Sequence, residues 1–482
     1  MNIFLLFLLP ICFAFNCDTT LLERQTMYEK ALNTLQNFKG IQSNLTFTKR
    51  SLGNPGGTYG AFLFPEYLQP LSLKYLEKNI SSFFNSSQVS TVMGNKDALI
   101  FLTCTPPSSD YFSIVNYVLA RFNSTKTHWL AGVPLNDPIN NLIINTTKNE
   151  YNSTTLIIST GDINSYNNIK KAFIDAGLNK NAINFLPIPN DKVKFRHYIE
   201  PWILDQSDLI SWHFRISSYN KTDTYIQEYL NTNWEFYFLK HYNGIFRNSE
   251  LEPAYSAPLR KRETNNNQLY LESKYNELIN KITNKMNTYN LTHQIKLNHV
   301  IPDFEQCLTN NSYYGIFYPI PEWNFTGLSG FCDFFVRDSL YSMYPNVNST
   351  SEILKDLKFY KNRTFIAVGI NQVKMRQCVY SNLLISTLSH PEDPLHTSNL
   401  TALELNDSTN QYGKNFDEFY TYKWSRNCEK NELYCQEFNE NQINSTTDWI
   451  IFAERKYLNP KSKIGPSEYE LLPPTILIFD KI

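Results

Sequence analysis

"TTLIISTGDINSYNNIKKAFIDAGLNKNAINFLPIP", residues 154–189, is the stretch that decides the predicted fold of this 482-residue chain. It opens on a short run with the length and apolar centre of a buried strand. Ile169, Phe173 and Ala176 then form a helical stripe that ends at Gly177, and INFLPIP has the pattern of a second strand. A strand, a helix and a strand in succession predict a β-α-β unit, which is typical of a parallel or mixed sheet with helices packed on it.

Segments on either side extend this pattern. Thr20 and Glu23 form a capping-box pair at the start of a predicted helix, and Gly40 is its expected end. An amphipathic helix is expected from Leu271 onward, with Leu278 on its apolar side. Further strands are predicted at 98–103 (ALIFLT), 364–370 (TFIAVGI), 448–455 (DWIIFAER) and 475–479 (TILIF).

We therefore predict an α/β (or α+β) fold: a mixed, largely parallel sheet with packed helices, in one large or two closely packed domains. The polar, proline-containing segment 252–268 is the best candidate for a linker or long surface loop. The expected division is a signal peptide at 1–14, an N-terminal α/β domain at 15–251, this linker at 252–268, and a C-terminal α/β or α+β domain at 269–482.

The N-terminus, MNIFLLFLLPICFAFNC, predicts a secretory signal peptide. Its apolar run from Ile3 to Phe15 is too short to span a bilayer, and Cys12 and Ala14 stand at the −3 and −1 positions of a cleavage site. No later stretch approaches the ~18–20 apolar residues of a membrane helix. We expect a secreted protein without a membrane span, in the extracellular space or the endolysosomal lumen.

Glycosylation signals agree with secretion. The chain has fifteen Asn-x-Ser/Thr sequons, against roughly eight expected by chance from its Asn, Ser and Thr content. The predicted glycosylation sites are Asn44, Asn79, Asn85, Asn123, Asn145, Asn152, Asn220, Asn290, Asn310, Asn324, Asn348, Asn362, Asn399, Asn406 and Asn444.

The cysteines predict a few disulfide bonds in an ordinary folded core. A short polar turn separates Cys428 from Cys435, and Cys307 and Cys332 flank an aromatic segment, so these are the first two predicted pairs. The seven mature cysteines leave an odd thiol. Our third pair is Cys17 with Cys104, which leaves Cys378 as the expected free thiol.

Composition narrows the class of function. A formal net charge of −1 gives no electrostatic case for nucleic acid or an anionic membrane surface as a partner. The 15% aromatic content is typical of a globular, core-forming protein. Fingerprints for dinucleotides, phosphates or a nucleophile elbow are absent, and no cofactor is expected.

One segment has the residue types of a metal site. LSHPEDPLHTS, residues 388–398, contains His390, Glu392, Asp393 and His396. Its prolines prevent a helix, so the ligands do not share a helical face. The alternative is an irregular loop folded around an ion, but an exposed polar loop is the favoured interpretation, and no metal site is predicted.

Two further features allow opposite readings. Asp162 follows a buried strand and opens a helix, where it is placed to act as a base, a metal ligand or a hydroxyl acceptor. The favoured alternative is that Asp162 or Ser165 is simply the helix N-cap. The segment 312–335 holds nine aromatic residues. Exposed, such rings stack on sugars; buried, they fill the core, and the core is favoured.

Three segments resemble a set of uncharacterised secreted proteins: CTPPSSDYFS (104–113), AVGINQVKMRQCVYSN (367–382) and RKYLNPKSKIGPS (455–467). The resemblance implies an architecture shared over most of the mature chain. It implies no activity and no catalytic residue.

We carry two hypotheses for function. The first is a secreted, N-glycosylated protein that binds a glycan or small-molecule ligand. The second is a secreted hydrolase whose carboxylate-based site, with Asp162 among its acids and bases, assembles only in the fold. The sequence assigns neither catalytic residues nor an oligomeric state. A deep polar pocket with convergent titratable groups favours the enzyme, and a shallow aromatic strip favours the binder.

Overall fold

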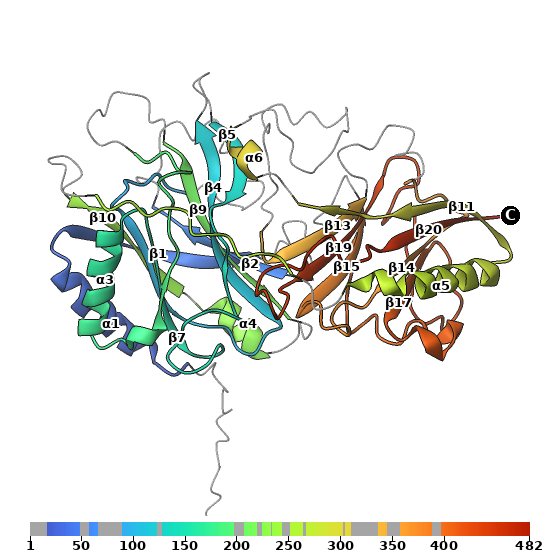
Figure 1. Ribbon diagram of the computed structural model, residues 1–482, viewed down its shortest axis with the longest axis horizontal. Helices are drawn as coiled ribbons and strands as arrows, with labels where there is room; N and C mark the ends of the chain where they lie inside the picture. Colours follow the sequence, from blue (N-terminus) through green and yellow to red (C-terminus); the bar gives the residue numbers. More distant parts are fainter. Residues whose placement is uncertain are drawn as a thin grey trace, which may run out of the picture.

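A computed structural model describes residues 17–48, 57–65, 89–122, 128–196, 207–218, 224–232, 234–242, 251–263, 267–301, 304–309, 336–344, 357–387 and 397–482. These residues form three sheets, one in the N-terminal half and two in the C-terminal half, with a few helices on their outer faces (Figure 1). Within the described residues, no helix combines the length and apolarity that crossing a membrane requires.

The N-terminal half is built on a ten-stranded sheet in the order β5-β4-β9-β2-β1-β10-β3-β7-β8, with β6 paired to β4. Its strands are β1 (Phe38–Thr48), β2 (Gly57–Leu63), β3 (Ala98–Cys104), β4 (Tyr111–Phe122), β5 (His128–Pro134), β6 (Ile139–Asn140), β7 (Thr154–Thr160), β8 (Ile183–Phe185), β9 (Leu209–Ser217) and β10 (Trp234–His241); its helices are α1 (Leu21–Thr34), α3 (Ile163–Asp175) and α4 (Thr224–Asn231).

This sheet curls until distant strands face each other across its interior. Trp212 of β9 donates its indole N–H to Ser159 Oγ of β7 over 3.0 Å, although four strands separate β9 from β7 in the sheet order. The concave face is lined by one large apolar cluster, to which Phe62, Phe101 and Phe236 contribute. Helices α1 and α3 pack side by side on the other face (Figure 1).

The C-terminal half contains two five-stranded sheets, β11-β20-β14-β17-β18 and β12-β13-β19-β15-β16. Its strands are β11 (Tyr289–Lys296), β12 (Asn298–Val300), β13 (Ser339–Tyr344), β14 (Arg363–Ile370), β15 (Tyr380–Thr387), β16 (Thr397–Thr401), β17 (Phe419–Ser425), β18 (Cys435–Glu437), β19 (Ile450–Tyr457) and β20 (Thr475–Lys481), and its helix is α5 (Glu272–Lys285). Helix α6 (Phe304–Thr309) follows in the sequence but packs beside β5 of the N-terminal half (Figure 1). Short 3-10 helices lie at Lys180–Ala182, Gln268–Leu271, Asn410–Tyr412 and Lys414–Phe416.

These two sheets form a sandwich. Buried side chains from both sheets, among them Phe365, Trp424 and Phe452, meet in one cluster between them. Helix α5 covers the outer face of the first sheet through Tyr275, Leu278 and other residues (Figure 1). This matches the apolar stripe expected from Leu271 onward.

The two halves contact each other through strands. Tyr111 of β4, Tyr380 of β15 and Tyr457 of β19 share one buried cluster, and the Tyr111 and Tyr457 ring centroids are 4.7 Å apart. The segment predicted as a linker or surface loop lies along this junction where it is described. Arg260 in this segment forms an ion pair with Asp137 of the N-terminal half, with 3.2 Å between Arg260 Nε and Asp137 Oδ2.

The predicted fold class is wrong. The described β-α-β unit is real, since β7 and β8 pair in parallel around α3, but the only other parallel pair among the described strands is β17 with β18. The sheets are large, curled and mainly antiparallel, with few helices. One parallel unit at a sheet edge gives no information on the direction of the other strands. Fully buried antiparallel strands such as β3 also have the continuous apolar sequence that is typical of parallel strands, so the sequence does not distinguish the two.

Local elements agree better with the sequence. Thr20 and Glu23 form the predicted capping box of α1. That helix ends at Thr34, however, and Gly40 lies in β1, so its predicted end is wrong. The predicted strands correspond to β3, β14, β19 and β20.

The structure contains two of the predicted disulfides, Cys17–Cys104 and Cys428–Cys435. Among the described cysteines, Cys378 is a buried free thiol, as expected. Cys307 is disulfide-bonded, but Cys332 lies outside the described residues, so that pairing stays a prediction.

Candidate functional site

A buried ion pair lies at the end of the sandwich that faces the N-terminal half. On β19, the inward positions Ile450 and Phe452 belong to the apolar core, and the next two inward positions are Glu454 and Lys456. Lys456 Nζ lies 2.6 Å from Glu454 Oε2, and their side chains are 0% and 3% exposed. Tyr420 of β17 donates its hydroxyl to Glu454 Oε1 over 3.1 Å. The inward-facing side chains of β19 therefore change from apolar to charged at this end of the sandwich.

A serine and a histidine continue this cluster. Lys456 Nζ donates to Ser342 Oγ of β13 over 2.6 Å, and Ser342 Oγ lies 2.8 Å from His299 Nδ1 of β12. His299 Nε2 lies 3.1 Å from the Leu471 carbonyl oxygen. A carbonyl only accepts, so Nε2 carries the proton and Nδ1 accepts from the Ser342 hydroxyl. This order resembles the nucleophile and base of a hydrolase.

The electrostatics of the cluster oppose that chemistry. Burial and the nearby Lys456 ammonium lower the pKa of His299 to about 3. An imidazolium formed by taking the Ser342 proton would stand beside this ammonium in a desolvated site. Ser342 is itself fully buried. The cluster is therefore better suited to holding β12, β13, β17 and β19 together than to attacking a substrate.

The connection from β14 to β15 carries Cys378, a buried thiol near Glu454 and Lys456. Gln372 exchanges side-chain hydrogen bonds with Gln268, which lies just before α5, at 2.7 and 3.2 Å. Burial, followed by the charge of Glu454, raises the pKa of the Cys378 thiol to about 12. A thiol held neutral in this way is a poor nucleophile and a poor metal ligand.

The outer side of the same connection forms one wall of a surface pocket. The pocket has a volume of about 310 Å³ and is lined by Asn371, Val373, Lys374, Ala402, Leu403, Asn406 and Asp407. One wall is the turn after β14, and the other is the turn after β16. Asn371 ties the walls together, because its Nδ2 donates to Ala402 O at 2.9 Å and to Asn406 Oδ1 at 2.8 Å.

The two walls carry opposite charges. Lys374 belongs to one wall and Asp407 to the other. The Lys374 ammonium has a long, exposed contact of 3.8 Å with Asp417, and such surface pairs contribute little energy. Asp407 adopts a positive φ of 60°, a conformation that Asp and Asn tolerate well. No aromatic side chain is among the lining residues.

The junction between the halves holds a second buried polar cluster. Tyr111 donates its hydroxyl to Asp338 Oδ2, and burial raises the pKa of this carboxyl. Arg215 of β9 donates to the Tyr117 hydroxyl over 2.7 Å. His213 lies beside Tyr117, with its pKa lowered to about 3 by burial and by Arg215. Segments 104–113, 367–382 and 455–467 meet here, through Tyr111, Tyr380 and Tyr457.

Asp162 is the N-cap of α3, so the favoured interpretation is confirmed with Asp162, not Ser165, in that position. Its Oδ2 accepts the Ser165 N–H at 2.9 Å and the Ser165 hydroxyl at 2.8 Å. Its Oδ1 accepts the Glu252 N–H at 2.9 Å. Both oxygens are occupied by protein donors, so Asp162 is not poised to act on a substrate.

Other predicted features fall outside the described part of the chain. His390, Glu392, Asp393 and His396 lie there, and so does the aromatic segment 312–335. Within the described residues, Cys428, Glu432 and Cys435 bring potential metal-ligand atoms within 4.8 Å of one another. The two sulfurs are bonded to each other, so neither is a thiolate ligand in this state.

Eight of the fifteen sequons lie in described residues. Six present an exposed asparagine: Asn44, Asn145, Asn152, Asn290, Asn362 and Asn444. Asn399 and Asn406 are half-buried. Outside the described residues lie Asn79, Asn85, Asn123, Asn220, Asn310, Asn324 and Asn348.

Sequence reasoning missed both the buried ion pair and the pocket. A signal for the ion pair existed: in IIFAERKY, alternate positions run from Ile450 and Phe452 to Glu454 and Lys456, so one face of a strand changes from apolar to charged. The pocket had no such signal. Its two walls lie about thirty residues apart in the chain and meet only in the fold.

Comparisons with known proteins add no function. Neither a protein-family model nor a curated protein matches the chain. Among solved structures, an uncharacterized protein from Burkholderia cenocepacia is similar at 8% sequence identity and a TM-score of 0.37, over 95% of this chain and 87% of that chain.

Proposed function

We propose that this chain is a secreted glycoprotein that binds a small zwitterionic ligand, of the class of free amino acids and short peptides, between the turns after β14 and β16. The observation that carries the proposal is the 310 Å³ pocket with Lys374 on one wall and Asp407 on the other. Ligand pockets in proteins start at about 300 Å³.

The chemistry of the lining supports this ligand class. An ammonium and a carboxylate on facing walls complement a ligand that carries both charges. Asn371 and Asn406 hold each other in place, and Val373 and Leu403 add apolar surface. Stacking on a sugar ring needs an aromatic side chain, which the lining residues do not supply, so a zwitterion fits this pocket better than a glycan does.

Binding is better supported than hydrolysis. The described groups that most resemble a catalytic set, Ser342 and His299, are opposed by the Lys456 ammonium. Both carboxylate oxygens of Asp162 serve as a helix cap. Secretion is supported by two disulfide bonds, which form in oxidising compartments, and by the exposed sequons.

The proposal is tested by calorimetry of the purified chain with amino acids, dipeptides and monosaccharides. We expect binding of a zwitterion that weakens about tenfold in Lys374→Met and in Asp407→Asn, because each removes one charge-assisted contact. Asp407→Asn keeps a residue that accepts the positive φ. Lys180→Met, which changes an exposed lysine in the N-terminal half, is the matched control and keeps full affinity.

Three results would count against the proposal. Binding of monosaccharides alone would exclude the zwitterion and keep a binding function. No binding at millimolar ligand would reject the function. Asn406 lines the pocket and is also a sequon asparagine, so a glycan on Asn406 of the secreted protein would occupy the proposed site.

A further inference from the structure

Asn399 and Asn444 head two sequons with opposite surroundings. Asn399 lies on β16 directly opposite Leu384 of β15, and residues directly opposite in an antiparallel pair point to the same face of the sheet. Leu384 packs in a buried cluster with Tyr341, and Phe304 of α6 packs against that cluster. The Asn399 side chain therefore lies on a covered face of the sheet.

The Asn399 amide has a hydrogen-bonded oxygen and a buried nitrogen. Its Oδ1 accepts a hydrogen bond from Asn382 Nδ2. Its Nδ2 has almost no accessible surface and no hydrogen-bond partner. A glycan is attached through this nitrogen, and a pyranose ring bonded to it needs open space that the folded chain does not provide.

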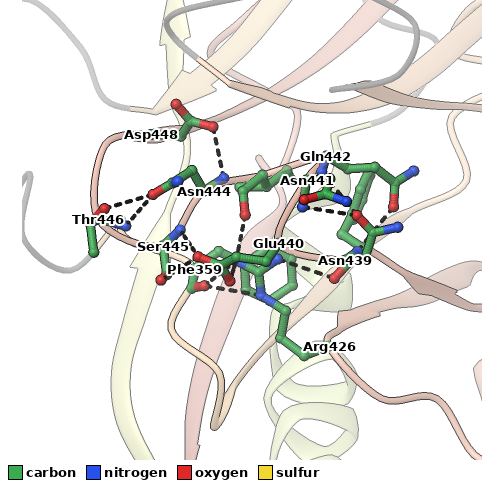
Figure 2. A network of polar contacts seen from close by, with 12 residues as sticks. Phe359, Arg426, Asn439, Glu440, Asn441, Gln442, Asn444, Ser445, Thr446 and Asp448 are labelled. Atoms are coloured by element: carbon green, nitrogen blue, oxygen red, sulfur yellow. Dashed lines mark hydrogen bonds and ion pairs between the residues drawn. The ribbon is translucent and has the colours of Figure 1, made fainter.

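Asn444 lies in an ordered turn at the surface (Figure 2). Its Oδ1 accepts from the Thr446 N–H at 2.9 Å and from the Thr446 hydroxyl at 2.7 Å. Its backbone N–H donates to Asp448 Oδ2 over 2.8 Å. These bonds orient the side chain through its oxygen and backbone, without using the Nδ2 that a glycan needs.

The rest of this turn is also held without that nitrogen. Ser445 donates its N–H and its hydroxyl to Glu440 Oε1, over 2.7 and 2.6 Å. Arg426 Nη2 lies 3.3 Å from Glu440 Oε2. The same nitrogen donates to the Phe359 carbonyl oxygen over 2.6 Å (Figure 2). The turn therefore keeps its structure when a glycan extends from Asn444.

From this contrast we infer that the fold determines which of these two sequons is glycosylated. Asn444 carries an N-glycan in the mature protein, and Asn399 carries none. The inference rests on the secretion part of the proposed function. In the reaction, the asparagine Nδ2 forms a bond to the anomeric carbon of a lipid-pyrophosphate-linked oligosaccharide. The bond from that carbon to the pyrophosphate oxygen breaks, the lipid pyrophosphate leaves, and Nδ2 loses one proton. Because this precedes folding, chains glycosylated at Asn399 cannot complete β16 packing and are lost.

The test is glycopeptide mapping of the full chain secreted by eukaryotic cells. We expect the Asn444 peptide to be glycosylated and the Asn399 peptide to be unmodified. Asn444→Asp keeps the oxygen that Thr446 binds but removes the acceptor nitrogen, so the protein should lose the mass of one glycan. Asn441→Asp changes a neighbouring exposed asparagine outside any sequon and should leave the mass unchanged.

Other outcomes overturn defined parts of this inference. A glycan on Asn399 of the folded, secreted protein contradicts the burial argument. A bare Asn444 in a protein glycosylated elsewhere contradicts the surface argument. A secreted protein with no glycan at any sequon rejects passage through a glycosylating compartment, which is a failure of the proposed function itself.

Discussion

One disulfide and one buried ion pair in each half of this molecule allow a comparison of cross-links that act at different ranges in the sequence. In the N-terminal half, the Cys17–Cys104 disulfide spans 87 residues, and the buried Arg121–Asp208 ion pair spans the same number. In the C-terminal half, the Cys428–Cys435 disulfide spans seven residues, and the Glu454–Lys456 ion pair joins positions two apart on one strand. Long-range links restrict the unfolded chain more than local ones.

The two ion pairs also differ in what they join. Arg121 binds Asp208 through two nitrogens, at 3.0 and 2.7 Å, and donates to the carbonyls of Leu308 and Lys192. It therefore connects β4, α6 and two loops. Lys456 connects strands of one sandwich end. Buried charges are tolerated in both places because hydrogen bonds satisfy them.

The largest expected effect is the loss of the long-range disulfide. Replacing Cys17 and Cys104 together with serine should lower the free energy of unfolding by about 4–5 kcal/mol, as the chain-entropy account gives for a loop of this length. Urea unfolding under non-reducing conditions measures it. A loss no larger than that of the Cys428–Cys435 double variant would contradict the comparison of the two halves.

Breaking the N-terminal ion pair should come next. Arg121→Met leaves the fully buried Asp208 carboxylate without its partner, at an expected cost of about 3–5 kcal/mol. Adding Asp208→Asn should recover part of this loss because the uncompensated charge is removed. The measurement is urea unfolding of both variants. Equal stability of the single variant and the native chain would show that the pair does not hold the half together.

The C-terminal ion pair should respond in the same direction. Lys456→Met leaves Glu454 buried and unpaired, and we expect a loss of about 3 kcal/mol. Glu454→Gln in that background should restore most of the stability, because its amide can still accept from the Tyr420 hydroxyl. If the double variant were as unstable as the single one, lost packing would explain the loss better than an unpaired charge.

A smaller effect is expected at the local disulfide. Replacing both Cys428 and Cys435 with serine should cost about 2–3 kcal/mol, because the closed loop is short. Urea unfolding of this variant and of the Cys17 and Cys104 double variant, under the same conditions, compares the two losses of free energy of unfolding. A cost above that of the long-range disulfide would reverse the ranking.

The smallest effect, counted per pH unit, is a dependence of the free energy of unfolding on pH, and one histidine in each half contributes to it. His213 in the N-terminal half and His299 in the C-terminal half have pKa values lowered to about 3. Below the unfolded value near 6.5, only the unfolded chain binds these protons, so stability should fall as pH drops from about 6.5 toward 3. Each histidine contributes at most about 1.4 kcal/mol per pH unit. His299→Gln should flatten the slope of urea midpoints against pH in this range, and an unchanged slope would contradict the assignment.

Much of the local structure could be predicted, because its causes lie within a few residues. The Thr20–Glu23 capping box, the Asp162 cap and the short Cys428–Cys435 link each join neighbours in the chain. The end of α1 could not be predicted in the same way. The chain enters β1 at Phe38, where tertiary pairing with β10 outweighs the helical pattern that extended to Gly40.

The candidate sites were far less predictable. Glu454 and Lys456 can be recognised in the sequence, because alternate residues of one strand change there from apolar to charged. Their partners Ser342 and His299 come from other strands. Lys374 and Asp407 have no feature in the sequence that links them. Proximity across about thirty residues depends on how β14, β15 and β16 pair, which no local pattern specifies.

By itself, the sequence determined several of the short segments that become helices and strands, the cap of α3 and the local Cys428–Cys435 link. Only the tertiary structure decided that the strands run mainly antiparallel, that the N-terminal sheet curls on itself and that a charged pocket opens beside a buried ion pair. Local elements arise from hydrogen bonds and side-chain spacing within a few residues. Strand direction and site geometry arise from contacts between distant segments, which form only when the whole chain packs.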